Sequence, residues 1–275
     1  MGRKLFCELG PVFYEISVFK ERTKRDIKNS LEKYKLATKK VNYELPVIIK
    51  SHTSIILRKL YNVDMQLQVN KKTNLEIASK KINKLVIHPG EIFSFWYLVG
   101  EANRKYGYKK GLVISKTGFR SEIGGGLCQL ANMIHYLVLN SPLEVVELHH
   151  HSDALFPDDR RRVPFGTGTS VFYNYLDYRF KNTLNQNIQI LVWVDNDVLC
   201  GELRSEKEIP YRYRLVEENH HFRKEGDKYY RISQVYRITI DKKTKKELKK
   251  EMILDNHSEV MYDYELIPKD QIRND

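Results

Sequence analysis

The hydrophobic pattern becomes almost wholly strand-like after Pro142, and this change constrains the fold more than any other feature. Before it, residues 19–40 are typical of a charged, solvent-facing helix, and apolar residues recur at helical spacing in 46–62 and in 71–84, where Asn74 is a candidate N-cap. After it, apolar and polar residues alternate as they do in strands, for example in "TSVFYNYLDYRFKN". Helices followed by antiparallel strands predict an α+β fold rather than a parallel α/β sheet.

The expected architecture is a helical N-terminal part, then a glycine-rich loop and a buried helix packed on an antiparallel β-sheet. The stretch "LVIHPGEIFSFW" predicts a strand, a Pro-Gly turn and an aromatic-rich strand, and "DND" at 195–197 predicts a hairpin turn. The chain then divides into a helical N-terminal region over 1–84, a core domain over 85–205 that carries the chemistry, and a β-rich C-terminal extension over 206–275.

The charge balance favours anionic partners. The chain has 47 Lys and Arg against 35 Asp and Glu, a formal net charge of +12, which attracts nucleic acid, acidic lipid headgroups or acidic envelope polymers. The basic residues are spread along the chain and no nucleic-acid-binding motif accompanies them, so nucleic acid is not an expected partner. A solvated basic surface is the simplest interpretation, and adhesion to an anionic membrane surface is the next.

The sequence predicts a soluble, cytoplasmic protein that can rest peripherally on a membrane. No apolar stretch is long enough for a transmembrane helix, and the N-terminal segment lacks the apolar core and cleavage site of a signal peptide. The three cysteines, Cys7, Cys128 and Cys200, are far apart and odd in number, which indicates free thiols in a reducing compartment.

The segment "IGGGLCQLANMIHYLVLN", residues 123–140, carries the strongest chemical signal. Three glycines precede an apolar stripe at helical spacing, so a helix is expected to begin at Leu127 or Cys128. A cysteine in the first turn lies beside unpaired N–H groups and the positive end of the helix dipole, which stabilise a thiolate. The same N–H groups, with Gln129, would stabilise an oxyanion.

A base for this thiol must come from elsewhere in the sequence. His135 follows two turns along the same helix, roughly 10 Å away, and is therefore too far. In the β-like run "LEVVELHHHSD", His149 and His151 share one strand face, and either is a candidate base. Asp153 or Asp177 is the candidate carboxylate that orients the imidazole. This arrangement predicts a cysteine hydrolase or acyl transferase.

Three alternatives remain open on the residues alone. Cys128 is also typical of a small buried side chain in a helix that needs glycines for close packing. With two of the adjacent histidines it would make a zinc site of three protein ligands, although no further ligand pair supports one, and neither a metal nor another cofactor is expected. Finally, the aromatic "FSFW" and the tyrosine-rich strands would suit a non-catalytic module that binds an envelope component or a partner protein.

Four motifs in the right order resemble the VanW family. They are "HPGEIFSFWYLVG", "EIGGGLCQLANMIHYLVLNSPLEVVELHHHS", "DDRRRVPFGTGTSVFYNYLDYRFKN" and "LVWVDNDVLCGE", and together they cover roughly residues 85–205. The resemblance implies an association with glycopeptide (vancomycin) resistance and the Gram-positive cell envelope, and it does not bring an established reaction. A peptidoglycan precursor is therefore the substrate that the resemblance suggests.

The resemblance also extends to individual positions around the cysteine. The family's Gly-Gly-Gly-x-Cys-Gln falls on Gly124, Gly125 and Gly126, followed by Cys128 and Gln129. The glycines and the glutamine are the expected substrate-binding residues beside the catalytic thiol.

Two further family motifs are matched, and a third is not. The family's His-x-His-Ser falls on His149, His151 and Ser152, and its Asp-x-x-Phe-x-Asn begins at Asp177. The resemblance implies that Ser152 contributes to substrate binding. Many relatives also carry Arg-Asp-Ala after a Pro-x-Gly, whereas this chain reads "PFGTGTS" there and has no Asp. That departure leaves Asp177 as the preferred orienting carboxylate.

Overall fold

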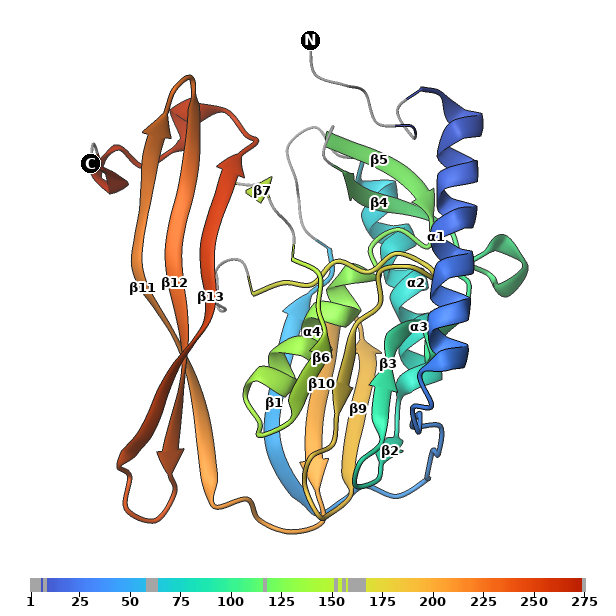
Figure 1. Cartoon of the computed structure of the whole chain (residues 1–275), viewed down its shortest axis with the longest axis vertical. Coiled ribbons are helices and arrows are strands. Elements are labelled where there is room, and N and C mark those ends of the chain that lie inside the picture. The colour runs from blue at the N-terminus through green and yellow to red at the C-terminus, as the bar shows by residue number, and fades with distance from the viewer. Residues whose placement is uncertain are drawn as a thin grey trace.

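The computed structural model of the chain describes residues 6, 9–57, 64–115, 118–150, 153–154, 157 and 167–273. Four α-helices accompany sheets whose strands pair almost entirely antiparallel in the described part of the chain, so the α+β prediction is confirmed. Figure 1 shows a body of sheets and helices, with the long helix α1 (Pro11–Leu31) along one side and the strands β11, β12 and β13 on the other.

The body is built on a four-stranded antiparallel sheet in the order β1-β10-β9-β2. Its strands are β1 (Val47–Ile55), β2 (Leu85–Ile87), β9 (Ile188–Asp195) and β10 (Val198–Ser205). The turn that joins β9 to β10 places Asn196 at a φ of 51°, which Asn tolerates better than most residues. The predicted "DND" hairpin is confirmed.

The predicted helix over 46–62 is wrong, because Val47–Ile55 forms the strand β1 on the edge of this sheet. The β-branched residues Ile48, Ile49 and Ile55 suit a pleated strand as well as a helix. A bulge between Ile48 and Lys50 interrupts the alternation of exposed and buried side chains, which hides the strand period in the sequence.

Helix boundaries were predicted in part. Helix α1 begins earlier than expected and ends at Leu31, because residues 32–40 run beside β2 and β3 instead, with Ala37 N–H donating to Ile92 O at 2.9 Å. Helix α2 (Met65–Ile82) is capped by Asp64 and not by Asn74, which lies buried in its middle. Helix α4 (Cys128–Leu139) begins where the glycine run predicts, and that prediction is confirmed.

The aromatic stretch after Pro89-Gly90 gives a short strand and then a helix. The strand is β3 (Ile92–Ser94), and the Ser94 hydroxyl caps α3 (Phe95–Val99) by accepting from Tyr97 N–H at 3.3 Å. The predicted aromatic surface at "FSFW" is wrong, since Phe93, Phe95 and Trp96 are at most 5% exposed and belong to the main core.

Two small sheets complete the body. One has the order β3-β8-β6, with β6 (Glu144–Glu147) and β8 (Arg179–Lys181), and the other pairs β4 (Lys110–Ser115) with β5 (Gly118–Ile123). Residues 169–178 are not a continuous strand as predicted but a turn closed by a bridge between Phe172 and Leu176.

The C-terminal residues form a separate sheet of long strands. Its members are β11 (Tyr211–Glu225), β12 (Lys228–Asp241) and β13 (Glu247–Val260), with β14 (Ile272–Arg273) and β7 (Asp153–Ala154) on its two edges. The antiparallel strands expected after residue 206 are confirmed, and a turn at 226–227 joins β11 to β12. The predicted boundaries near residues 84 and 205 stay predictions.

Candidate functional site

The glycine run before α4 is a site of close backbone packing. A side chain on Gly125 would place its Cβ 2.1 Å from the carbonyl oxygen of Gly111, on strand β4. Gly124 and Gly126 have φ values of 78° and 94°, and a Cβ on Gly126 would collide with the Lys71 side chain. These positions therefore require glycine for packing, whether or not they also contact a ligand.

The Cys128 thiol lies at the first residue of α4, but it faces the protein interior. It packs against the main core, and its S–H is 3.9 Å from the carbonyl oxygen of Val171. Burial raises the pKa of this thiol, and the hydrogen bond to Val171 offsets only part of that effect. The thiolate expected at the helix start is therefore not favoured in this conformation.

Gln129 ties the start of α4 to the edge of the central sheet. Its side-chain N–H groups donate to Ser54 Oγ at 2.9 Å and to the Ile55 carbonyl at 3.0 Å, both on β1. The side-chain N–H groups of Gln129, which were expected to stabilise a substrate oxyanion, are therefore already bonded within the protein.

His149 is held by a carboxylate that the sequence did not single out. Its Nε2 lies 2.9 Å from Glu147 Oε1, and its backbone carbonyl accepts from Ser170 N–H at 2.6 Å. Ser170 precedes Val171, so His149 and Cys128 contact consecutive residues of the same segment. His151 and Ser152, and the side chain of Asp153, lie outside the described residues, and the Cys–His dyad stays a prediction.

Glu147 is the centre of a buried group of charges that we call the Glu147 cluster, formed by Arg25, Glu147, Asp177 and Arg179. Arg25 reaches it from α1 with a bidentate ion pair, in which Nη1 donates to Glu147 Oε2 at 2.7 Å. Burial alone would raise the pKa of Glu147, but hydrogen bonds from His149 and Arg25, and the Arg25 charge, lower that pKa to about 2.

Asp177, at the opposite end of the Glu147 cluster, has a structural role. Its carboxylate accepts from Ser94 Oγ at 2.5 Å, from Trp96 N–H at 3.0 Å and from Arg179 Nε at 2.7 Å. It thus fixes the start of α3 against β8, and the carboxylate in contact with His149 is Glu147. The sequence signal for Glu147 was its place two residues before His149, on the same strand face.

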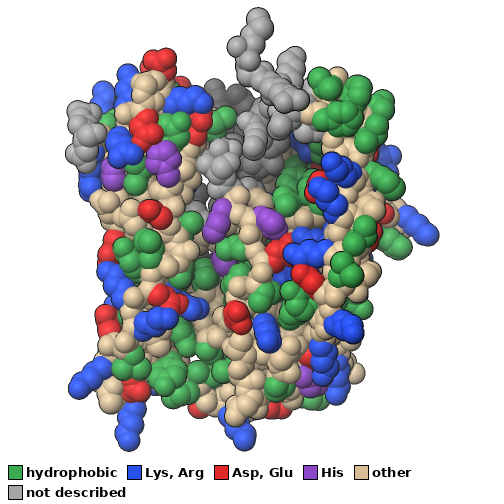
Figure 2. Space-filling model, in the orientation of Figure 1, with side chains coloured by type: hydrophobic (Ala, Val, Ile, Leu, Met, Phe, Trp, Pro, Cys, Tyr) green, Lys and Arg blue, Asp and Glu red, His purple; other side chains and the backbone are tan. Residues whose placement is uncertain are grey.

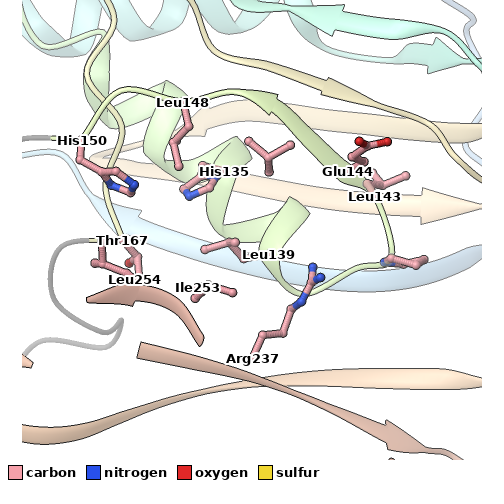
Figure 3. Close-up of a pocket in the computed structure, with 12 residues that line it drawn as sticks. His135, Leu139, Leu143, Glu144, Leu148, His150, Thr167, Arg237, Ile253 and Leu254 are labelled. Carbon is pink, nitrogen blue, oxygen red and sulfur yellow. The ribbon is translucent and has the colours of Figure 1, made fainter. Parts of the chain in front are cut away.

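A cleft of about 350 Å³ opens between the body and the C-terminal sheet, and we call it the His135 cleft. Figure 3 shows side chains from α4, including His135 and Leu139, opposite Arg237 of β12 and Ile253 and Leu254 of β13. The residues that line it are His135, Leu139, Pro142, Leu143, Glu144, Val145, Leu148, His150, Thr167, Arg237, Ile253 and Leu254.

His135 contributes a neutral ring to this cleft. Its Nδ1 lies 3.1 Å from the hydroxyl of Tyr178, and burial, together with the nearby His150, lowers its pKa to about 3. The imidazole is therefore uncharged at neutral pH and offers a hydrogen-bonding group without a charge.

Arg237 brings a fixed cation to the opposite wall. Its Nε donates to Glu251 Oε1 at 2.8 Å and its Nη1 to the Ser141 carbonyl at 3.2 Å, while the guanidinium lies 5.4 Å from the ring centre of Tyr213. Nη2 also donates to Glu251 Oε1, so the guanidinium is already in an ion pair with that carboxylate. These contacts orient the planar group and leave one N–H on each of its two terminal nitrogens for a ligand. No sequence pattern pointed to Arg237, since it lies about a hundred residues from α4.

Two further properties bear on function. Within the described ranges, no group of three His, Cys, Asp or Glu side chains is arranged to hold a metal ion. None of the helices in the described part of the chain is long and apolar enough to cross a membrane.

Comparisons with known proteins agree with the motifs. The family model described as VanW like protein matches residues 70–204. The chain is 30% identical over 185 residues to the vancomycin B-type resistance protein VanW of Enterococcus faecalis. The aligned region covers 66% of this chain and 67% of that protein. It is also 30% identical over 149 residues to the uncharacterized protein YoaR of Bacillus subtilis, of which it spans 48%. No solved structure matches.

Proposed function

The chain belongs to the VanW-like family, and we propose that it supports vancomycin resistance as a binding protein for peptidoglycan-type peptides. The observation that carries this proposal is the His135 cleft, which joins an apolar wall to a few convergent polar groups, as ligand sites do. The name of the Enterococcus relative supplies the biological context.

The chemistry of the cleft suits a short peptide. Leu139, Leu143 and Val145 offer apolar surface to small side chains, while the Arg237 guanidinium matches a terminal carboxylate. The neutral His135 ring suits an amide, because it forms hydrogen bonds without demanding a charged partner. Peptidoglycan peptides combine carboxylates, amides and small apolar side chains.

A pair of adjacent substitutions tests the cleft. Ile253 lines it from β13, whereas the neighbouring Met252 is 55% exposed and does not line it. Ile253→Trp fills the cleft, and Met252→Trp adds the same ring outside it. Titration calorimetry with soluble peptides released from peptidoglycan should show binding to the wild type and Met252→Trp, and a loss of about tenfold or more in Ile253→Trp.

The same pair should separate in cells. In a host that lacks the gene, Met252→Trp restores vancomycin resistance and Ile253→Trp does not. Equal peptide binding by both variants, or absence of binding by the wild type, would contradict the proposed function.

A cysteine hydrolase or acyl transferase is the second candidate, and one observation favours it. Cys128 begins α4, and its thiol contacts the carbonyl of Val171. The His149 ring is hydrogen-bonded to Glu147, and the His149 carbonyl accepts from the neighbouring Ser170 N–H. The raised pKa of Cys128 argues against it in this conformation. A chain carrying Cys7→Ser and Cys200→Ser leaves this thiol alone, so its rate of alkylation against pH reports its pKa.

The outcome separates the two candidates. A thiol that reacts with an apparent pKa well below about 8.5, together with loss of resistance in Cys128→Ser, supports the enzyme. A thiol that reacts only at higher pH, together with retained resistance, supports the binding protein. In the resistance assay, Cys200→Ser alone is the matched control for Cys128→Ser. It also removes a thiol whose pKa is raised by burial, but one that lies away from His149 in the sequence.

We place this function at the cytoplasmic face of the membrane. The three widely spaced cysteines suit a reducing compartment, and precursors of the cell wall carry their peptides there. Cell fractionation tests this assignment, which fails if the protein is recovered outside the cell.

A further inference from the structure

Helix α1 turns its apolar side chains away from the protein. Large apolar residues recur on one face at spacings of three or four, in a first group over residues 12–19 and a second over residues 27–31, with the polar Thr23 between the two groups. We call this face the α1 stripe. It consists of Val12, Ile16, Phe19, Ile27 and Leu31, whose side chains are 69, 49, 72, 56 and 75% exposed.

The opposite face of α1 holds the helix to the body through polar contacts. Arg25 is 7% exposed and forms the ion pair with Glu147, and Arg22 donates to the carbonyl of Tyr173 at 3.2 Å. A polar face directed inward fixes the rotation of the helix, so the exposure of the α1 stripe is set by the docking of α1. Figure 2 shows green side chains gathered at the upper right, over the first half of α1.

Lysines run along one border of this stripe. Lys20, Lys24 and Lys28 follow each other at a spacing of four residues, and all are exposed. Lys24 also contacts Glu21 of the same helix, and Lys28 contacts Glu32 just after its end, but ion pairs of such exposed lysines are weak. An apolar face bordered by lysines is typical of helices that lie in the interface of an anionic bilayer.

We propose that α1 binds the surface of an anionic lipid bilayer, lying in its plane with the α1 stripe among the headgroups and its lysines beside lipid phosphates and carboxylates. This inference is independent of the proposed peptide binding. Figure 1 shows α1 on the side of the body opposite to β11–β13, so the C-terminal sheet does not block its approach to a flat surface, while the loop between α3 and β4 projects beside the middle of the helix.

Charge decides between a bilayer and a second copy of the chain as the occupant of this face. Two copies, each with a net charge of +12, repel each other as they approach. A leaflet that contains acidic lipids attracts the same charge, and each lysine near the surface adds to the attraction. The bilayer is therefore the occupant that the charges favour.

Vesicle flotation with the full chain tests the proposal. The vesicles are phosphatidylcholine alone or phosphatidylcholine mixed with phosphatidylserine. The stripe variant combines Ile16→Ser and Phe19→Ser, and the control combines Leu248→Ser and Met252→Ser, two residues of β13 that are each 55% exposed. We expect wild type and control to float with the mixed vesicles, and the stripe variant to bind about tenfold more weakly or worse.

A charge variant separates the two contributions. Lys20→Glu with Lys28→Glu keeps the stripe and should lose the preference for phosphatidylserine, as should wild type in high salt. The substituted positions are exposed, so the unfolding temperature serves as the check on folding. Equal flotation of stripe variant and control overturns the proposal, as does a wild type that ignores the mixed vesicles. Dimerisation abolished by the stripe variant assigns the face to a second copy instead.

Discussion

Helices α1 and α4 are both amphipathic, and they turn opposite faces toward the protein. The apolar face of α4 is fully buried in the main core, where Leu130, Ile134 and Leu137 are 0% exposed. The apolar face of α1 is exposed, and its buried face carries Arg25. Hydrophobic periodicity thus identifies an amphipathic helix and its two faces, but the groups offered by the neighbouring strands decide which face turns inward.

For α1 the neighbours are charged. The carboxylate of Glu147 and the guanidinium of Arg179 lie where the helix docks, and Arg179 Nη2 also donates to Asn29 Oδ1 at 2.7 Å. For α4 the neighbours are the apolar faces of β1 and β10. The comparison predicts that α1 depends on paired charges and α4 on packing.

The largest effect is expected when the charge pair is broken. Glu147→Ala leaves Arg25 and Arg179 buried without their shared carboxylate, which should lower the free energy of unfolding by about 3–5 kcal/mol. Urea unfolding measures this loss. The matched control is Glu21→Ala on α1, whose partner Lys24 is exposed, and it should change stability by less than about 1 kcal/mol.

A double substitution sharpens this result. Arg25→Met with Glu147→Leu removes both charges and should be less damaging than Glu147→Ala alone, because no buried charge of the pair is left without its partner. If the single variant were as stable as the control, docking of α1 would not rest on this pair.

The second prediction compares the same side chain on the two helices. Ile134→Ala on α4 opens a cavity in the core and should lower the free energy of unfolding by about 2–5 kcal/mol. Ile16→Ala on α1 removes a side chain that is 49% exposed and should change it by less than about 0.5 kcal/mol. Similar losses at both positions would mean that the α1 stripe is covered within the folded chain.

The start of α4 and the β9–β10 hairpin could be predicted because their signals are local. A glycine run before helical spacing, and an Asp/Asn turn between alternating residues, each specify a short stretch without help from the rest of the fold. The strand β1 could not be told from a helix, because its isoleucines satisfy both periods and a bulge breaks the alternation.

The site was predicted less completely, since its geometry joins distant segments. The His135 cleft brings together residues from α4, from β12 and from β13, and the sequence holds no pattern that relates them. The lowered pKa expected for the Cys128 thiol rested on the helix start alone. Burial of the thiol against the core is a tertiary effect, and it raises the pKa that the helix start was expected to lower.

The third prediction uses pH, because each helix is linked to one buried titratable group. The folded-state pKa of Glu147 is about 2, below its ordinary value of 4.5, so its contribution is complete above pH 4.5 and is lost as pH falls toward 2. That contribution is about 3 kcal/mol, and Glu147→Gln should remove this part of the pH dependence. Urea unfolding at a series of pH values measures it.

His135 acts in a different pH range. Its folded-state pKa is about 3 against an ordinary 6.5, so the unfolded chain takes up a proton first as pH falls below 6.5. Stability therefore declines between pH 6.5 and 3, and His135→Gln should flatten the upper part of that decline, between pH 6.5 and 4.5, where Glu147 does not contribute. A variant that kept the wild-type slope there would show that the imidazole is not buried in its neutral form.

The smallest effect is expected at the residue next to Arg25. Lys24 pairs with Glu21 at 2.7 Å, but these side chains are 59% and 46% exposed, so water and salt screen their attraction. Lys24→Gln should lower the free energy of unfolding by less than about 0.5 kcal/mol, and the difference should vanish in high salt. The loss caused by Glu147→Ala should persist in the same salt, because the pair it breaks is buried. The ion pairs of the adjacent residues Lys24 and Arg25 would then differ in both the size and the salt dependence of their contributions, which is expected only if α1 is attached through its charged face. A salt-sensitive loss of similar size at both positions would contradict that mode of attachment and would leave the exposure of the α1 stripe without its structural cause.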